Sequence, residues 1–142
     1  MHYRSWLLVP GDSETKLAKA VATEADVIVV DLEASVEIGA KRPARQLAAE
    51  WLAIHRVKIV EQQRMRRWVR INGLDSRMWC DDLDAVMPCA PDGIILPKVN
   101  SARDVMQLSH YLDALEVREG VAQGSISIVP VSDLSRLTGT RP

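Results

Sequence analysis

The stretch ADVIVVDLEAS, residues 25–35, sets an apolar run directly before two carboxylates. Residues 27–30 are all Val or Ile with no polar alternation, a pattern typical of a parallel strand that is covered on both faces. Asp31 and Glu33 are two residues apart, so their side chains leave the strand on the same side. The stretch therefore predicts a buried strand of a parallel sheet whose carboxyl end carries two acids.

Comparable units occur on both sides of this stretch. We expect strands over residues 5–10, 26–33, 66–72, 92–99 and 125–131, and helices over residues 12–23, 41–63, 76–88 and 101–120. Strands that alternate with helices predict a mainly parallel sheet with helical crossovers. Two α/β architectures fit this order, a (β/α)8 barrel and an open doubly wound sheet. No GxGxxG motif follows the first strand to favour a dinucleotide-binding sheet.

The chain of 142 residues is short for a complete barrel, which takes about 250 residues. We expect residues 1–142 to form a single truncated domain, a partial TIM (β/α)8 barrel of roughly four and a half βα units, since a complete barrel has eight. Residues 132–142 are expected to be an irregular polar tail. A half barrel leaves its sheet edges open, which predicts that the chain forms a homo-oligomer.

Charge and cysteine usage exclude several classes of partner. A formal net charge of -1 predicts no nucleic-acid partner, and the basic stretch RMRRWVR, residues 64–70, is interpreted as a solvated entry to a strand. Cys80 and Cys89 lack metal-ligand spacing, which indicates reduced thiols. No apolar run approaches the roughly 20 residues of a membrane span, and the N-terminus lacks the pattern of a signal peptide. We therefore expect a cytoplasmic protein with no membrane partner.

Polar side chains are expected at the carboxyl ends of the strands, where parallel α/β folds bind their ligands. Asp31 and Glu33 end the second strand, Arg70 lies near the end of the third, and Lys98 lies near the end of the fourth. Arg70 offers a planar fork for a carboxylate or thioester substrate, and Lys98 suits an anionic ligand. The two acids suit Mg²⁺ held through water.

Structural interpretations of the same residues stay open. The acids Asp31 and Glu33 would also form a salt bridge with Arg70 or Lys98 that only holds the fold together. Lys98 is alternatively a Schiff-base nucleophile, although nothing in the sequence indicates the burial that would lower its pKa. The acids of the stretch CDDLD, residues 80–84, are interpreted as a solvated helix face.

Four linked motifs resemble the citrate lyase beta-subunit-like branch of the HpcH/HpaI aldolase family. They are RSWLLVPGDSETKLAKA (residues 4–20), ADVIVVDLEASVEIGAKRPAR (25–45), VRING (69–73) and GIILPKVNS (93–101), and the match extends from Arg4 to about Val131. The resemblance implies the N-terminal half of a TIM barrel that cleaves or forms a carbon–carbon bond in a 3-hydroxyacyl-CoA such as citryl-CoA or malyl-CoA. It also implies Mg²⁺ as cofactor and an acyl-CoA or small carboxylate as ligand.

The resemblance assigns roles to individual residues. Arg70 corresponds to the catalytic arginine that contacts the substrate, and the segment with Arg4 and, less closely, Lys16 corresponds to the part that lies beside CoA. Asp31 and Glu33 correspond to acids that support the metal without binding it directly. Lys41 and Arg45 match a K…AR signature of the family to which we assign no role at this point.

Several positions depart from the family pattern. Ala34 stands where the family has an acid, and Asn100 stands where it has a glutamate. The metal-binding glutamate that follows strand five in the family has no clear counterpart, since Asp133 is only a nearby acid, and the metal-binding aspartate of the sixth unit falls beyond residue 142. We therefore expect no turnover from these residues alone. The alternatives are a non-catalytic half barrel that self-associates or binds a CoA or carboxylate ligand, and an open α/β binding domain unrelated to lyases.

Overall fold

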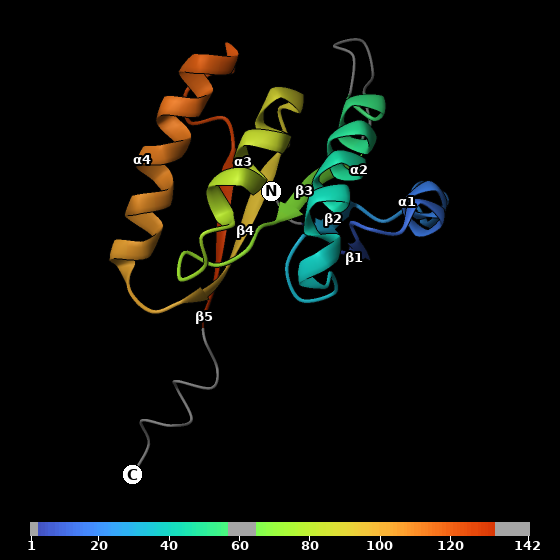
Figure 1. Cartoon of the computed structure of the whole chain (residues 1–142). Helices are drawn as coiled ribbons and strands as arrows, with labels where there is room; N and C mark the ends of the chain where they lie inside the picture. Colours follow the sequence, from blue (N-terminus) through green and yellow to red (C-terminus); the bar gives the residue numbers. More distant parts are fainter. Residues whose placement is uncertain (1–2, 57–64, 133–142) are drawn as a thin grey trace.

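The computed structural model describes residues 3–56 and 65–132, in which strands and helices alternate as expected (Figure 1). The strands are β1 (Trp6–Pro10), β2 (Val27–Asp31), β3 (Arg66–Arg70), β4 (Gly93–Val99) and β5 (Ser127–Ser132). The α-helices are α1 (Glu14–Ala20), α2 (Lys41–Ile54), α3 (Trp79–Val86) and α4 (Ala102–Glu119), with short 3₁₀ turns η1 (Val21–Thr23), η2 (Ile38–Ala40) and η3 (Met87–Cys89). Within the described ranges, no helix has the length and apolar character needed to cross a membrane.

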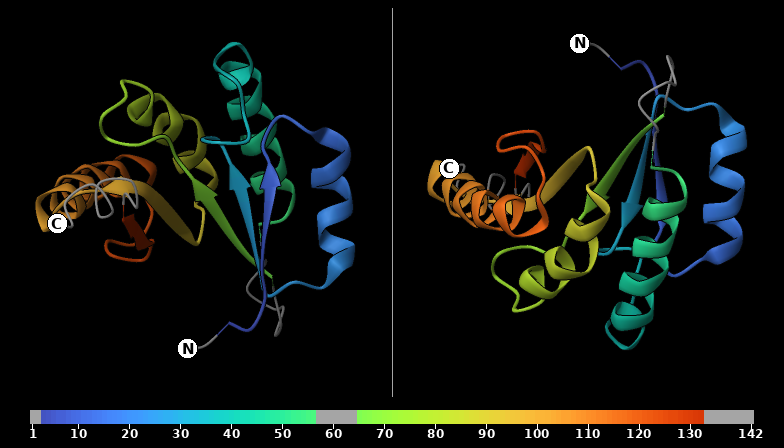
Figure 2. Two further views of the ribbon diagram at one scale, coloured as in Figure 1. Left: turned by 90° about the horizontal axis from the view of Figure 1, so that it is seen from below. Right: turned by 90° about the horizontal axis from the view of Figure 1, so that it is seen from above.

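The five strands form one parallel sheet in the order β1-β2-β3-β4-β5, which is also their order in the sequence. The helices follow one another along one side of this sheet (Figure 2). A doubly wound sheet reverses its strand order and carries helices on both faces, whereas a barrel keeps sequential order with all helices outside. The fold is therefore a partial barrel, and β1 and β5 are the edges of its sheet in the described part of the chain.

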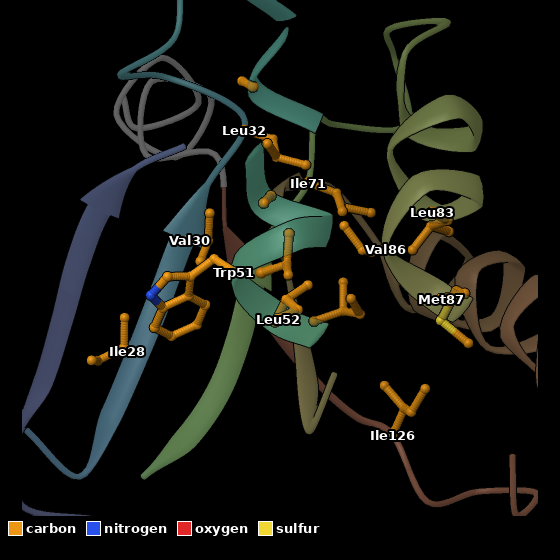
Figure 3. Close-up of a cluster of buried hydrophobic side chains, with 14 of the residues drawn as sticks. Ile28, Val30, Leu32, Trp51, Leu52, Ile71, Leu83, Val86, Met87 and Ile126 are labelled. Carbon is orange, nitrogen blue, oxygen red and sulfur yellow. The ribbon is translucent and has the colours of Figure 1, made fainter. Parts of the chain in front are cut away.

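The main core lies between the sheet and the helices (Figure 3). Alternate residues of the central strands, such as Ile28, Val30 and Val69, point to this side and are fully buried. They meet the apolar stripes of the helices, in which Leu52 of α2 and Leu83 of α3 are also fully buried. This explains why the strand at residues 27–31 contains no polar residue before its last position.

The opposite face of the sheet carries no helix and would be the inside of a complete barrel. Val27, Val29 and Trp68 form a small buried cluster on it. The Trp68 ring lies across Gly93 of the neighbouring strand, where an added Cβ would be only 2.4 Å from ring carbons. Towards the two edges this face stays exposed, with Trp6 at 45% and Leu8 at 46% on β1, and Val129 and Val131 on β5.

Several element boundaries differ from the expectation. Helix α2 ends at Ile54, and most of the remainder of the predicted helix, residues 57–63, lies outside the described residues. Helix α3 begins at Trp79, because Ser76 forms a turn in which its N–H and its hydroxyl both donate to the Gly73 carbonyl. Strand β5 includes Ser132, whereas the rest of the predicted tail lies outside the described residues.

The prediction that the basic stretch at residues 64–70 is solvated is wrong for Arg67, which is 2% exposed. Its side chain points to the helical side of β3, and its guanidinium donates to the carbonyls of Leu52, Cys89 and Ala90. These carbonyls lie at the ends of α2 and η3, where helical backbone leaves acceptors without partners of its own. Arg67 therefore joins two helix ends to the sheet.

Candidate functional site

Four charged side chains meet at the carboxyl ends of β2, β3 and β4, and we call them the strand-end cluster: Asp31, Glu33, Arg70 and Lys98. Arg70 Nε lies 2.7 Å from Asp31 Oδ1, and Arg70 Nη2 lies 2.8 Å from Asp31 Oδ2. Glu33 reaches both cations, with 3.6 Å between its Oε1 and Arg70 Nε and 3.8 Å between its Oε2 and Lys98 Nζ. The structure thus brings together the four residues that the sequence placed at the strand ends, and their ion pairs also fit the structural interpretation.

Asp31 is completely enclosed by protein donors. Its side chain accepts the N–H groups of Glu33 and Ser35, the Ser35 hydroxyl and both nitrogens of the Arg70 fork. Burial alone would raise the pKa of Asp31, but the hydrogen bonds from Arg70, Ser35 and Glu33 outweigh it and lower the pKa to about 2. The same pair raises the pKa of Arg70. Asp31 and Arg70 are therefore both charged at neutral pH.

Glu33 and Lys98 are the less constrained members of the cluster. Within the described ranges, the Glu33 carboxylate has ion-pair contacts but no hydrogen bond. Lys98 lies where β4 and β5 lose their regular register, and its φ of 57° is in the left-handed region that side-chain-bearing residues seldom adopt. Its side chain is about half exposed. Such backbone strain is typical of positions that orient a functional group.

A pocket of about 230 Å³ opens beside Lys98. Its lining includes Asp75 from the loop after β3, Asn100 between β4 and α4, and Asp104 in the first turn of α4. Asn100, one of the departures from the family pattern, therefore lies next to the strand-end cluster. The lining carries carboxylates on two sides, so this pocket does not by itself favour an anion.

A second polar network lies beneath the cluster and was missed by the sequence analysis. Asp82 is fully buried and accepts hydrogen bonds from Arg45 and from the backbone and side-chain amides of Asn72. The interpretation of residues 80–84 as a solvated face is therefore wrong for Asp82. A signal was present, since Asp82 lies four residues before the buried Val86 and hence on the apolar face of α3.

Lys41 belongs to this buried layer. It is 7% exposed, and its Nζ donates to the carbonyls of Leu32 (2.8 Å) and Glu33 (2.7 Å). Burial lowers the pKa of Lys41, an effect that the nearby charges of Asp82, Asp31 and Glu33 partly offset. The K…AR signature thus contributes two side chains, Lys41 and Arg45, to the support of the strand ends.

The remaining predicted site residues lie apart from the cluster. Lys16 is exposed in the first turn of α1, on the side where β1 ends. Arg4 precedes β1, and its backbone N–H donates to Asp26 before the start of β2, at the opposite end of the sheet from Asp31. Their contact with CoA stays a prediction.

The described residues do not fit an Mg²⁺ centre. Mg²⁺ takes near-octahedral oxygen ligands. The Asp31 oxygens already accept five hydrogen bonds, two of them from Arg70, and are therefore not available to the ion. Across residues 3–56 and 65–132, no group of three or more His, Cys, Asp or Glu could hold a metal ion. Indirect support of a metal by Asp31 and Glu33 stays a prediction.

Comparison with known proteins places this geometry in a family. The family model described as HpcH/HpaI aldolase/citrate lyase matches residues 4–131. The (3S)-malyl-CoA thioesterase of Cereibacter sphaeroides is 34% identical over 139 residues, covering 96% of this chain and 47% of the relative. The citrate lyase subunit beta of Haemophilus influenzae is 33% identical over 126 residues, covering 89% of this chain and 42% of the relative. The chain spans less than half the length of these relatives.

A solved structure of similar fold is that of the protein CitE from Mycobacterium tuberculosis in complex with magnesium, acetoacetate and coenzyme A. It has a TM-score of 0.62 and 25% sequence identity, and the match covers 90% of this chain and 48% of CitE. The described sheet and helices thus correspond to about half of a larger barrel-like fold.

Proposed function

The chain belongs to the HpcH/HpaI aldolase/citrate lyase family, and from this we propose that its strand-end cluster serves the cleavage or formation of a carbon–carbon bond in a 3-hydroxyacyl-CoA. Citryl-CoA and malyl-CoA are the proposed substrates. The observation that carries the proposal is the Arg70 guanidinium, which Asp31 fixes at the carboxyl ends of the parallel strands inside the matched segment.

The proposed reaction breaks the bond between the hydroxyl-bearing carbon and the carbon next to the thioester. The electron pair of that bond passes to the carbon next to the thioester, which forms an enolate. The hydroxyl group gives its proton to solvent as it becomes a carbonyl, and the enolate carbon takes a proton from solvent, so the products are an oxo acid and an acyl-CoA. A carboxylate on the hydroxyl-bearing carbon needs a cation to hold it in place. Arg70 is suited to this task because Asp31 engages its Nε and Nη2, while its Nη1 has no hydrogen-bond partner in the described part of the chain.

Lys98 and Lys16 are the proposed further contacts of the anionic substrate. The Lys98 side chain is about half exposed beside Glu33, so its ammonium can turn to a ligand without leaving the cluster. Lys16 lies where β1 ends and is better placed for the CoA phosphates than Arg4, which lies at the other end of the sheet. We include Arg4 as a CoA contact on the strength of the family resemblance alone.

We propose that these 142 residues bind the substrate but do not turn it over. The solved CitE complex contains magnesium, and the described residues of this chain lack a ligand set for that ion. No step of the proposed reaction is therefore routed through a metal held by this half of the barrel. Binding and turnover are separable in experiment.

The decisive experiment is a binding titration followed by a product assay. Acetoacetate and CoA are titrated into the isotope-labelled protein, and we expect amide shifts at Ile71 and Val99, which adjoin Arg70 and Lys98. Arg70→Lys keeps the charge but loses the fork, so the Kd of acetoacetate obtained from these shifts should rise at least tenfold. Arg42→Lys on the exposed side of α2 is the matched control. Absence of any shift in the wild-type protein contradicts the proposal.

The product assay separates carbon–carbon cleavage from thioester hydrolysis, the reaction for which the Cereibacter sphaeroides relative is named. With malyl-CoA and Mg²⁺, a lyase yields acetyl-CoA and glyoxylate, whereas a thioesterase yields malate and free CoA. We expect neither product from the chain as given. Glyoxylate formation that disappears in Arg70→Ala would show turnover and contradict the expected inactivity. Malate formation would also contradict it and would mean that the chain hydrolyses the thioester instead of cleaving the carbon–carbon bond.

A second candidate function, a self-associating half barrel, is favoured by the uncovered inner face of the sheet. Trp6, Leu8, Val129 and Val131 are exposed large apolar side chains of the two edge strands, all on the side without helices. A second copy of the chain would cover them. Sedimentation velocity over a hundredfold range of concentration tests this candidate, and Leu8→Lys should shift the protein to monomer. Ile54→Lys, an exposed apolar position on α2, is the control that should not.

A further inference from the structure

The loop that follows β2 is held through its backbone by charges of opposite sign. Asp31 accepts the N–H groups of Glu33 and Ser35, both at 2.9 Å. Lys41, the first residue of α2, donates its ammonium to the carbonyls of Leu32 and Glu33 at 2.8 and 2.7 Å. The Asp31 carboxylate thus binds N–H groups of the loop while the Lys41 ammonium binds its carbonyls, so both the donors and the acceptors of the loop backbone are held.

The position of Lys41 is costly for a lysine. Its side chain is almost fully buried, and removing an ammonium from water is unfavourable unless several acceptors replace the lost hydration. The two carbonyls that it binds belong to the loop after β2, not to the helix in which Lys41 resides. Lys41 therefore stabilises the conformation of that loop specifically.

The segment after β3 fixes the same loop a second time. The Asn72 side-chain amide donates to the Leu32 carbonyl at 3.0 Å and to Asp82 at 2.7 Å. Leu32 is thereby tied to the segment after β3 and to α3, and Glu33, the next residue, extends from this anchored point. Its carboxylate lies 3.6 Å from Arg70 Nε and 3.8 Å from Lys98 Nζ without a hydrogen bond of its own in the described ranges. The backbone contacts are thus the main fixed support of Glu33.

We propose that Lys41 is a positioning residue, which holds the Leu32 and Glu33 carbonyls so that the Glu33 carboxylate lies between Arg70 and Lys98. The benefit to a bound carboxylate or thioester rests on the proposed function, whereas the effect on the loop does not. Without the ammonium the Leu32 carbonyl keeps only the Asn72 amide and the Glu33 carbonyl only the Val36 N–H, so the loop changes its path and Glu33 leaves its place between the two cations. Arg70, which Asp31 holds independently, stays where it is.

The test compares Lys41→Met, which keeps length and removes the charge, with Lys41→Arg, which keeps a cation. Lys19→Met on the exposed side of α1 is the control. Amide hydrogen exchange is measured residue by residue, together with the ¹³C shift of the Glu33 carboxyl carbon and the Kd of acetoacetate. In Lys41→Met we expect at least tenfold faster exchange at Ser35 and Glu33 and a changed Glu33 carboxyl shift. We also expect at least tenfold weaker acetoacetate binding, because Lys98 loses the carboxylate that keeps it beside Arg70. Lys41→Arg should recover part of each effect.

The readouts separate a positioning role from a structural one. Exchange that rises equally in β1 to β4 means that Lys41 supports the fold as a whole, and it overturns the proposal. An unchanged Glu33 carboxyl shift in Lys41→Met overturns it as well. If the loop responds as expected but wild-type protein does not bind acetoacetate, the positioning of Glu33 stands and the proposed function fails.

Discussion

Asp31 and Arg70 occupy the same level of two adjacent parallel strands and are joined by two hydrogen bonds of 2.7 and 2.8 Å. Both are the last residues of their strands, so the pair closes the inner face of the sheet at its carboxyl end. Asp31 is fully buried and Arg70 partly exposed. The contact therefore stabilises the sheet and also presents a pre-oriented guanidinium at the rim, so the structural interpretation of these residues is compatible with the proposed functional one.

Acid should weaken the fold through Asp31. The pKa of its carboxyl is lowered from 3.8 to about 2 by the Arg70, Ser35 and Glu33 hydrogen bonds, which outweigh the effect of burial. A lowered pKa means that the unfolded chain binds the proton first, so this contribution is complete above about pH 4 and is lost as the pH falls towards 2. It amounts to about 2 kcal/mol. Urea unfolding at pH values from 2.5 to about 5 measures it.

Asp31→Asn should remove this part of the pH dependence and lower the unfolding free energy at pH 7, because Arg70 then faces a neutral partner. Asp12→Asn, at an exposed position, is expected to keep the wild-type profile. A profile of Asp31→Asn that matches the wild-type slope between pH 2.5 and 4 would assign the acid sensitivity to other carboxylates.

Gly93→Ala should destabilise the sheet, since an added Cβ would be 2.4 Å from the Trp68 ring. The ring cannot move away freely, because it packs against Trp6 with 5.2 Å between ring centroids and lies over buried valines. Overpacking of this kind costs about 1–3 kcal/mol. Gly39→Ala, where no atom lies within 4 Å of an added Cβ, is the control. Adding Trp68→Leu to Gly93→Ala should recover part of the loss in a double-mutant cycle.

Asp82→Ala and Asp81→Ala form a matched pair on one helix. Asp82 is buried and accepts hydrogen bonds from Arg45 and Asn72, whereas Asp81 is exposed. Removing the Asp82 carboxylate leaves a partly buried guanidinium and two buried amide groups without their acceptor, which costs about 3–5 kcal/mol. Asp81→Ala should change the unfolding free energy by less than about 0.5 kcal/mol. Equal effects of the two substitutions in thermal unfolding would contradict the role given to Asp82.

The fold was predictable because its strongest signals are local. The run at residues 27–30, the end of α4 at Gly120 and the strict alternation of elements all follow from periodicity and turn chemistry. The strand-end cluster was predictable for a related reason, since parallel strands bring their carboxyl ends to one rim. Boundaries such as the start of α3 depended on the turn at Ser76, which periodicity does not reveal.

The buried polar layer was not predictable in the same way. Lys41, Arg67 and Asp82 are charged residues whose burial depends on partners 8 to 37 residues away in the sequence. Charged residues are usually solvated, so composition and spacing favour a surface position for each of them. Only the position of Asp82 on the apolar face of α3 indicated that it is buried. For Lys41 and Arg67 there was no such sign in the sequence, because the carbonyls that they bind come within reach only once the helices pack on the sheet.

Lys98 offers a direct test of whether strain and function reside in one residue. Its φ of 57° is unfavourable for any residue with a side chain, and glycine adopts it without penalty. Lys98→Gly and Lys98→Ala both remove the ammonium, but only glycine relieves the backbone. Lys98→Gly should therefore be more stable than Lys98→Ala by about 1 kcal/mol in urea unfolding. Both variants should bind acetoacetate more weakly than the wild-type protein and equally weakly, because the lost cation is the same. Equal stability of the two variants would mean that the surroundings of Lys98 do not hold it under strain, and unchanged binding in both would remove Lys98 from the proposed substrate contacts.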